Sequence, residues 1–210
     1  MKKIAQKALE TFSTRRMEAL TDGVFAIAMT LLILDIKVED FGTVTNSAQL
    51  AAALYDHSTV LISFVISFLL LGSMWAVHMR QFEYITQTDR HLTMINTWRL
   101  LIVVFMPLTT SIGGAYQGIE LARVLLPFNF FLLSAVSTWE WRYAANNEYL
   151  SEKIPPAIKQ DAWRRNIIIL VTAGLVSVLS FFVGQLAFLL FAVLPFVAIA
   201  GERNKHTSRS

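Results

Sequence analysis

Six runs of mainly apolar residues follow one another along the chain, separated by short stretches that carry most of the charge. A helix needs roughly 17 to 25 mainly apolar residues to cross a bilayer, and the runs fit or nearly fit that length. The fifth and sixth runs almost touch at Gly184, where glycine favours a tight hairpin over one overlong helix. The pattern predicts an all-α integral membrane protein with six transmembrane helices, at 19–36, 59–79, 94–115, 119–140, 164–183 and 185–201.

Basic residues fall on alternate sides of this pattern. Positively charged residues are retained on the cytoplasmic side of a membrane. All of the 18 lysines and arginines except Lys37 and Arg123 occur at the two ends of the chain or near the connections that follow the second and fourth runs. We therefore expect both termini to be cytoplasmic, with an N-terminal segment at 1–18, a six-helix transmembrane domain at 19–201 and a tail at 202–210.

The composition supports a membrane protein and removes several kinds of chemistry. Hydrophobic residues make up 55% of the chain and charged residues 16%, whereas soluble domains carry about 25% charged residues. Without cysteine there are no disulfides, thiolate metal sites or cysteine nucleophiles. The net charge of +3 has a sufficient cause in the cytoplasmic loops, so no nucleic-acid partner is expected.

Motifs for catalysis and cofactor binding are missing from the sequence as well. It contains no phosphate-binding loop, no dinucleotide-binding loop, no zinc-protease motif and no serine-hydrolase motif. We expect neither an enzyme nor a bound metal or cofactor. The "TVGYG" filter is also absent, which excludes a potassium channel built on that ring of carbonyls.

An aspartate, Asp22, stands near the start of the first run, "LTDGVFAIAMTLLIL". A carboxylate inside a membrane span is costly, and it is a functional-site hypothesis by default. At 100 degrees per residue, Asp22 lies about 140 degrees from Ile27, so it faces away from the aliphatic stripe that Ile27 begins. Depth indicates a contact with His78, and with Trp75 or an arginine as further partners. We interpret Asp22 as part of a polar clasp between the first two spans, with a proton relay as the alternative.

The stretch "RMEALTDGVFAIAMTLLIL" resembles the signature first helix of the transmembrane protein 175 family of lysosomal and bacterial potassium channels. That family carries Arg-x-x-x-Phe-Ser-Asp ahead of a hydrophobic helix. "MWAVHMRQF", with Trp75 and His78, is similar to the end of the family's second span. The resemblance implies a six-span bacterial member that assembles as a homotetramer. In this chain leucine replaces phenylalanine and threonine replaces serine, so the motif reads Arg16, Leu20, Thr21 and Asp22.

The resemblance also implies where ions would pass. In the family, the first helix of each subunit lines the pore, and an isoleucine five residues after the motif aspartate narrows it, which is Ile27 here. Leu31 and Leu34 continue that face, and Thr30 matches a family threonine. One helix cannot enclose a pore, so several copies must surround an axis, and their aliphatic rings would form a hydrophobic gate. The Thr30 hydroxyl either faces the pore or bonds to the Ala26 carbonyl of its own helix.

Three functions follow from these observations. The leading hypothesis is a passive channel for potassium and other monovalent cations in the plasma membrane of a bacterium. The second is a secondary transporter, which would place polar residues near the bilayer midplane. The third is a membrane scaffold that transports nothing, which the missing motifs allow. The candidate midplane residues for a transporter are Pro107, Thr109, Thr110 and Asn129.

Overall fold

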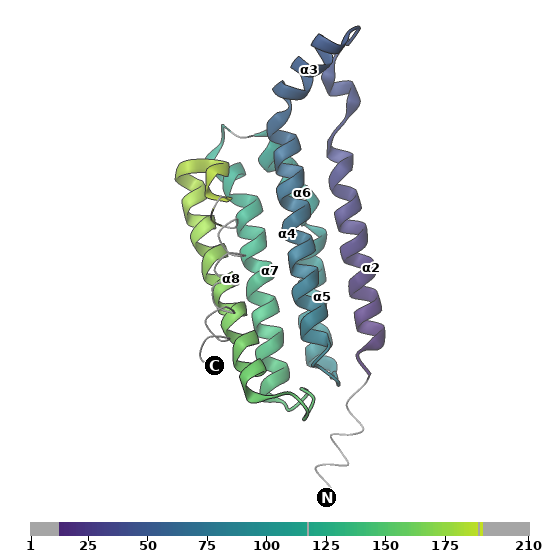
Figure 1. Cartoon of the computed structure of the whole chain (residues 1–210), viewed down its shortest axis with the longest axis vertical. Coiled ribbons are helices and arrows are strands. Elements are labelled where there is room, and N and C mark those ends of the chain that lie inside the picture. Colours follow the sequence, from purple (N-terminus) through teal and green to yellow (C-terminus); the bar gives the residue numbers. More distant parts are fainter. Residues whose placement is uncertain (1–12, 117, 189, 191–210) are drawn as a thin grey trace, which may run out of the picture.

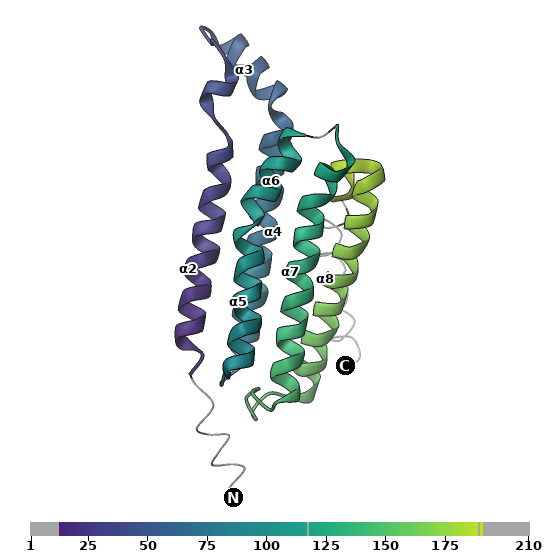
Figure 2. The same cartoon turned by 180° about the vertical axis from the view of Figure 1, so that it is seen from behind.

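The chain folds into a bundle of long helices that lie side by side, with a short helical projection at one end (Figure 1, Figure 2). The computed structural model describes residues 13–116, 118–188 and 190. α2 lies at one edge of the bundle and α8 at the opposite edge in both views. The elements are α2 (Arg15–Leu31), η1 (Leu32–Asp35), η2 (Val38–Phe41), α3 (Ser47–Asp56), α4 (Ser58–Phe82), α5 (Arg90–Val104), α6 (Met106–Ala115), α7 (Glu120–Asn146), α8 (Pro156–Val183) and η3 (Gly184–Phe188).

Five helical segments within the described residues are long and apolar enough to cross a membrane. They are α2 with its 3-10 extension, α4, α5 with α6, α7 and α8, and they correspond to the first five predicted spans. The predicted all-α membrane fold is therefore confirmed. Most of the predicted sixth span lies outside the described residues, as do 1–12 and the tail at 202–210.

The third span is not one continuous helix. α5 ends at Val104 and α6 starts at Met106, so the helix breaks at Phe105, close to Pro107. Proline has no N–H to give to the preceding turn, and its ring clashes with that turn, which explains the break. The Asn129 side chain of α7 donates to the Ile102 carbonyl over 3.2 Å, which supplies a partner inside the bundle next to the break.

Two ends of elements show how local sequence sets the fold. α8 ends at Val183, and the next residue, Gly184, has a φ of +60°, in the left-handed region that favours glycine, at the position where the sequence predicts a hairpin. α3 begins after Asn46, whose side chain accepts a hydrogen bond from the Gln49 N–H over 2.9 Å as an N-cap. α3 belongs to the projecting part of the chain and was not among the predicted elements.

Apolar packing divides the bundle into two clusters. The larger joins all the long helices through residues such as Phe25, Leu71, Met106, Phe130 and Val176. The smaller lies at what we call the inner end, where α2 begins and α4 ends, and includes Phe82, Ile85, Leu92, Trp141 and Tyr149.

Backbone pairing joins the two connections at the inner end, the one between α4 and α5 and the one between α7 and α8. Ile85 and Leu150 form an antiparallel bridge. The Thr86 N–H donates to the Tyr149 carbonyl over 2.9 Å, and the Ser151 N–H donates to the Tyr84 carbonyl over 2.8 Å. These bonds fix the two connections to each other.

Candidate functional site

α2 has one buried face and one exposed face. Met17, Thr21, Phe25 and Ala28 are buried against the neighbouring helices at helical spacing. Another side carries an aliphatic stripe, which we define as Ile27 and Leu31 of α2 and Leu34 of η1. Their exposed fractions in the single chain are 60%, 42% and 65%. The residues predicted to line a pore therefore share a face that no other part of the described chain covers.

The remaining residues of the family motif divide between these two faces. Arg16 and Leu20 are exposed on the side of the stripe, and Thr21 is buried. Thr30 is also exposed, and its hydroxyl donates to the carbonyl of Ile27 over 2.8 Å. Thr30 therefore bonds to its own helix, but to the carbonyl of Ile27 and not to the predicted carbonyl of Ala26. Its hydroxyl oxygen still has lone pairs that can accept a hydrogen bond from a further partner.

Asp22 makes its contact with α4 through Trp75. The indole Nε1–H of Trp75 donates to Asp22 Oδ1 over 2.9 Å, which joins the first two spans as the clasp interpretation requires. The predicted contact between Asp22 and His78 was wrong, because His78 is buried and accepts a hydrogen bond from Arg99. Asp22 itself is exposed in the single chain.

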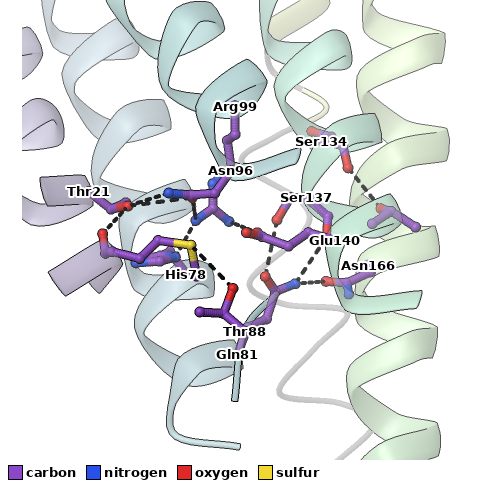
Figure 3. Close-up of polar contacts among 12 residues, drawn as sticks. Thr21, His78, Gln81, Thr88, Asn96, Arg99, Ser134, Ser137, Glu140 and Asn166 are labelled. Carbon is purple, nitrogen blue, oxygen red and sulfur yellow. Dashed lines mark hydrogen bonds and ion pairs between the residues drawn. The ribbon is translucent and has the colours of Figure 1, made fainter. Parts of the chain in front are cut away.

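A second contact reaches α2 from α5. The Asn96 amide nitrogen donates to the Thr21 hydroxyl over 3.0 Å, and the Thr21 hydroxyl in turn donates to the Met17 carbonyl over 2.8 Å. The Asn96 amide oxygen accepts from Arg99 over 2.9 Å. One amide thus connects the buried face of α2 to an arginine in the interior of the bundle (Figure 3).

Arg99 is the centre of this polar network. It is 1% exposed, and it forms an ion pair with Glu140 of α7, which is completely buried. Its other guanidinium nitrogen donates to His78 Nδ1, so this histidine nitrogen acts as an acceptor. Loss of one partner of a buried ion pair is costly, because it leaves an unpaired charge in the interior.

The network continues towards α8. The Gln81 amide nitrogen of α4 lies 3.4 Å from both the Ser137 carbonyl and the Asn166 amide oxygen, and Ser137 donates back to Gln81. Figure 3 shows these side chains at one depth of the bundle, between α4, α7 and α8. Polar side chains from α2, α4, α5, α7 and α8 therefore gather in one layer near the inner end.

Sequence reasoning missed the most buried part of this layer. The topology argument counts Arg99 among the basic residues on the cytoplasmic side, and it gives no role to Glu140. A signal was present, because Arg99 and Glu140 both fall within predicted spans, where ionisable residues are rare and usually paired.

The midplane residues proposed for a transporter make contacts within the bundle. Thr110 donates to Ser67 over 2.7 Å and Thr109 donates to the Met106 carbonyl over 3.0 Å, while Asn129 bonds to α5 as described. A cavity of about 320 Å³ lies elsewhere and is lined by Ser63, Ile66, Gly113, Arg123, Leu126, Phe182, Val183, Gly184 and Phe188. Within the described residues, no group of three or more histidine or acidic side chains could hold a metal ion.

Comparison with known proteins agrees with this architecture. The family described as endosomal/lysosomal potassium channel TMEM175 matches residues 16–107. A crystal structure of a lysosomal potassium-selective channel TMEM175 homolog from Chamaesiphon minutus superimposes with a TM-score of 0.69 at 27% sequence identity. That comparison covers 89% of this chain and 97% of the other.

Two relatives are similar in sequence. Potassium channel Cha6605_3372 of Chamaesiphon minutus is 33% identical over 147 residues, which are 69% of this chain and 72% of the relative. Potassium channel B446_29190 of Streptomyces collinus is 41% identical over 101 residues. In that case the match spans about half of each protein, 48% of both. From its first-helix motif, its helical membrane fold and these similarities, the chain belongs to the TMEM175 family.

Proposed function

We propose that the protein is a passive, potassium-permeable cation channel in which four copies of the chain surround a central pore. α2 of each copy lines the pore, and the aliphatic stripe of Ile27, Leu31 and Leu34 forms the gate. The proposal includes permeation by other monovalent cations, a lipid bilayer as surroundings, and no requirement for a cofactor or a metal ion other than the permeant cation.

One observation carries this proposal: the aliphatic stripe is exposed along α2, whereas polar contacts hold the opposite side of the same helix. Trp75 and Asn96 bond to Asp22 and Thr21, which both point away from the stripe. Because α2 lies at the edge of the bundle and is bonded to it on one side, its other side can face the α2 helices of other copies around an axis. The names of the two potassium-channel relatives support the same assignment.

The gate would work without a cage of carbonyl oxygens. Rings of isoleucine and leucine close a pore by excluding water and by steric contact, and they open when the side chains retract. We expect modest preference for potassium over sodium, because no fixed oxygens replace the hydration shell of the ion. Thr30 adds one hydroxyl oxygen per copy beside the constriction.

The distribution of charge supports placement in a bacterial plasma membrane with both termini in the cytoplasm. Lys37 and Arg123 are the only basic residues that the predicted topology assigns to the outer side. The inner end of the bundle, with its exposed basic residues such as Arg80, Arg90 and Arg142, would then face the cytoplasm.

A potassium-flux assay tests the channel proposal. Purified protein is reconstituted into liposomes, and wild type is compared with Ile27→Asn at matched protein density. Because the amide would hydrate the constriction, we expect faster passive potassium flux or looser selectivity from the variant. The matched control is Val178→Asn, since Val178 on α8 is 63% exposed, like Ile27, but lies at the other edge of the bundle.

The alternatives make different predictions in this assay. A secondary transporter would show flux that depends on a coupling ion and that Ile27→Asn does not increase. A scaffold would give no flux from either protein while the oligomer remains intact. Equal effects of Ile27→Asn and Val178→Asn would contradict a pore on α2.

A further inference from the structure

We propose that Arg99, whose hydrogen bonds go to Asn96, His78 and Glu140, is the positioning residue that fixes the rotation of α2 about its own axis. This inference rests on the proposed channel function. Arg99 acts through Asn96 and Thr21, and together with the separate contact between Trp75 and Asp22 it keeps the aliphatic stripe directed at the pore axis.

The two contacts with neighbouring helices lie on two different sides of α2, both away from the aliphatic stripe. Measured from Ile27 at 100 degrees per residue, Thr21 lies at about +120 degrees and Asp22 at about −140 degrees. The line midway between them lies about 170 degrees from Ile27. Asn96 of α5 bonds to Thr21, and Trp75 of α4 bonds to Asp22. Two helices thus resist rotation in opposite directions, and the stripe lies almost directly opposite them.

Arg99 determines which way the Asn96 amide faces. A guanidinium has donors only, so it can bond to the amide oxygen of Asn96 and not to its nitrogen. The bond from Arg99 to that oxygen, 2.9 Å long, leaves the amide nitrogen directed at Thr21. If the amide turned over, its nitrogen would oppose the guanidinium, and Thr21 would have to give up its hydrogen bond to the Met17 carbonyl in order to donate to Asn96.

Arg99 is in turn fixed by side chains of α7 and α4. The buried Glu140 of α7 and the ring of His78 occupy its two terminal nitrogens, and its guanidinium carbon lies 5.9 Å from the centre of the Phe82 ring. A donor held by three groups has little freedom to release Asn96. The pairing of α7 with α5 is therefore transmitted to the rotation of the pore helix.

Cysteine crosslinking can measure this rotation directly, because the natural chain contains no cysteine. Ile27→Cys should crosslink between copies under copper–phenanthroline oxidation, whereas Ala26→Cys, which is about 100 degrees away, should crosslink weakly. The quantity measured is the ratio of crosslinking at these two positions. Tetramer yield by size exclusion is measured for every variant.

Thr21→Val and Thr21→Ser form the decisive pair. Valine keeps the shape of threonine without the hydroxyl, and serine keeps the hydroxyl. We expect Thr21→Val to lower the crosslinking ratio about threefold, which corresponds to the about 0.6 kcal/mol average of interhelical hydrogen bonds in membranes. Thr21→Ser should leave the ratio unchanged.

The double variant Arg99→Met with Glu140→Met removes the ion pair without leaving a lone buried charge. It should lower the ratio as Thr21→Val does, and adding Thr21→Val to it should cause no further loss.

The outcomes separate this inference from the channel proposal. If Ile27→Cys crosslinks in the parent protein and the ratio is the same in Thr21→Val and in the double variant, the positioning role of Arg99 is overturned and the pore on α2 stands. If Ile27→Cys does not crosslink in intact tetramers, the pore on α2 is overturned and the positioning role with it.

Discussion

Among single residues, Asp22 has a structural contact that can be tested apart from conduction. Its carboxylate accepts from the Trp75 indole and points away from the aliphatic stripe. We expect Asp22→Ala to cost about 0.6 to 1.7 kcal/mol, the range for hydrogen bonds between helices in membranes. The variant should lower tetramer yield more than it changes the ratio of potassium to sodium flux. Trp75→Phe, which removes the indole N–H of the other partner and makes the aromatic ring smaller, should act in the same direction. Normal yield and a normal crosslinking ratio of Ile27→Cys to Ala26→Cys, together with altered selectivity, would show that Asp22 acts on the ions.

Asp89 provides a prediction about pH. This residue lies between α4 and α5, and it accepts from the Leu92 N–H over 2.7 Å, from Tyr143 over 2.7 Å and from Tyr149 over 3.0 Å. Burial raises the pKa of the carboxyl, but these bonds and nearby His91 lower it more, so its pKa lies below the ordinary value. A lowered pKa stabilises the fold above the ordinary carboxyl pKa of about 3.9, and this contribution is lost as pH falls through the folded-state value.

Thermal unfolding in detergent as a function of pH tests this assignment. Asp89→Asn keeps an oxygen for Leu92 but loses the charge that the two tyrosines hydrogen-bond. Because the site is half-buried, we expect a loss of about 1 to 2 kcal/mol at neutral pH. The variant should also lose the part of the acid sensitivity that lies below about pH 4. Identical pH profiles for both proteins would show that the ionised carboxylate contributes nothing.

The limits of sequence reasoning at this scale are visible in the polar layer. A helical wheel places Asp22 and Ile27 correctly relative to each other, because helix geometry is local. It cannot decide between Trp75 and His78 as partner of Asp22, since both lie near the end of one helix and the choice depends on how α2 and α4 pack. Arg99 and Glu140 are 41 residues apart, and only the fold brings them together.

Among the elements, the break between α5 and α6 distinguishes a structural role from a transport role for Asn129. Its side chain donates to the Ile102 carbonyl beside the break. Asn129→Leu should lower the free energy of unfolding by about 1 kcal/mol, the usual net value of one hydrogen bond. The flux ratio of potassium to sodium should not change. A changed ion preference in a stable protein would return Asn129 to the transporter hypothesis.

Helix positions in the membrane were largely readable from the sequence, because a bilayer demands long apolar runs whatever the tertiary contacts. The break at Phe105 was not, since a proline inside an apolar run often only bends a helix. α3 could not be predicted because it is too short for a membrane span, at 10 residues, and has no buried residue that would give the sequence a clear apolar pattern.

For the whole molecule, the orientation in the membrane is the most direct prediction. Ala51→Cys on α3 and Lys153→Cys in the connection between α7 and α8 are both exposed positions, one at each end of the bundle. An impermeant maleimide added to intact cells should label Ala51→Cys, and should label Lys153→Cys only after permeabilisation. The reverse pattern would place the termini outside. The absence of natural cysteines makes each label specific.

The bridge between Ile85 and Leu150 gives the two ends of the molecule different mechanical properties. At the inner end, two connections are joined by backbone bonds over an apolar cluster. Toward the outer end, no residue from Lys37 to Asp56 is buried. Segments with few buried contacts open locally at low free-energy cost, so backbone amides such as Thr86 and Ser151 should exchange with deuterium far more slowly than those of α3. The inner end would then serve as a rigid base, and a stimulus that reshapes the channel would meet less resistance from the outer side.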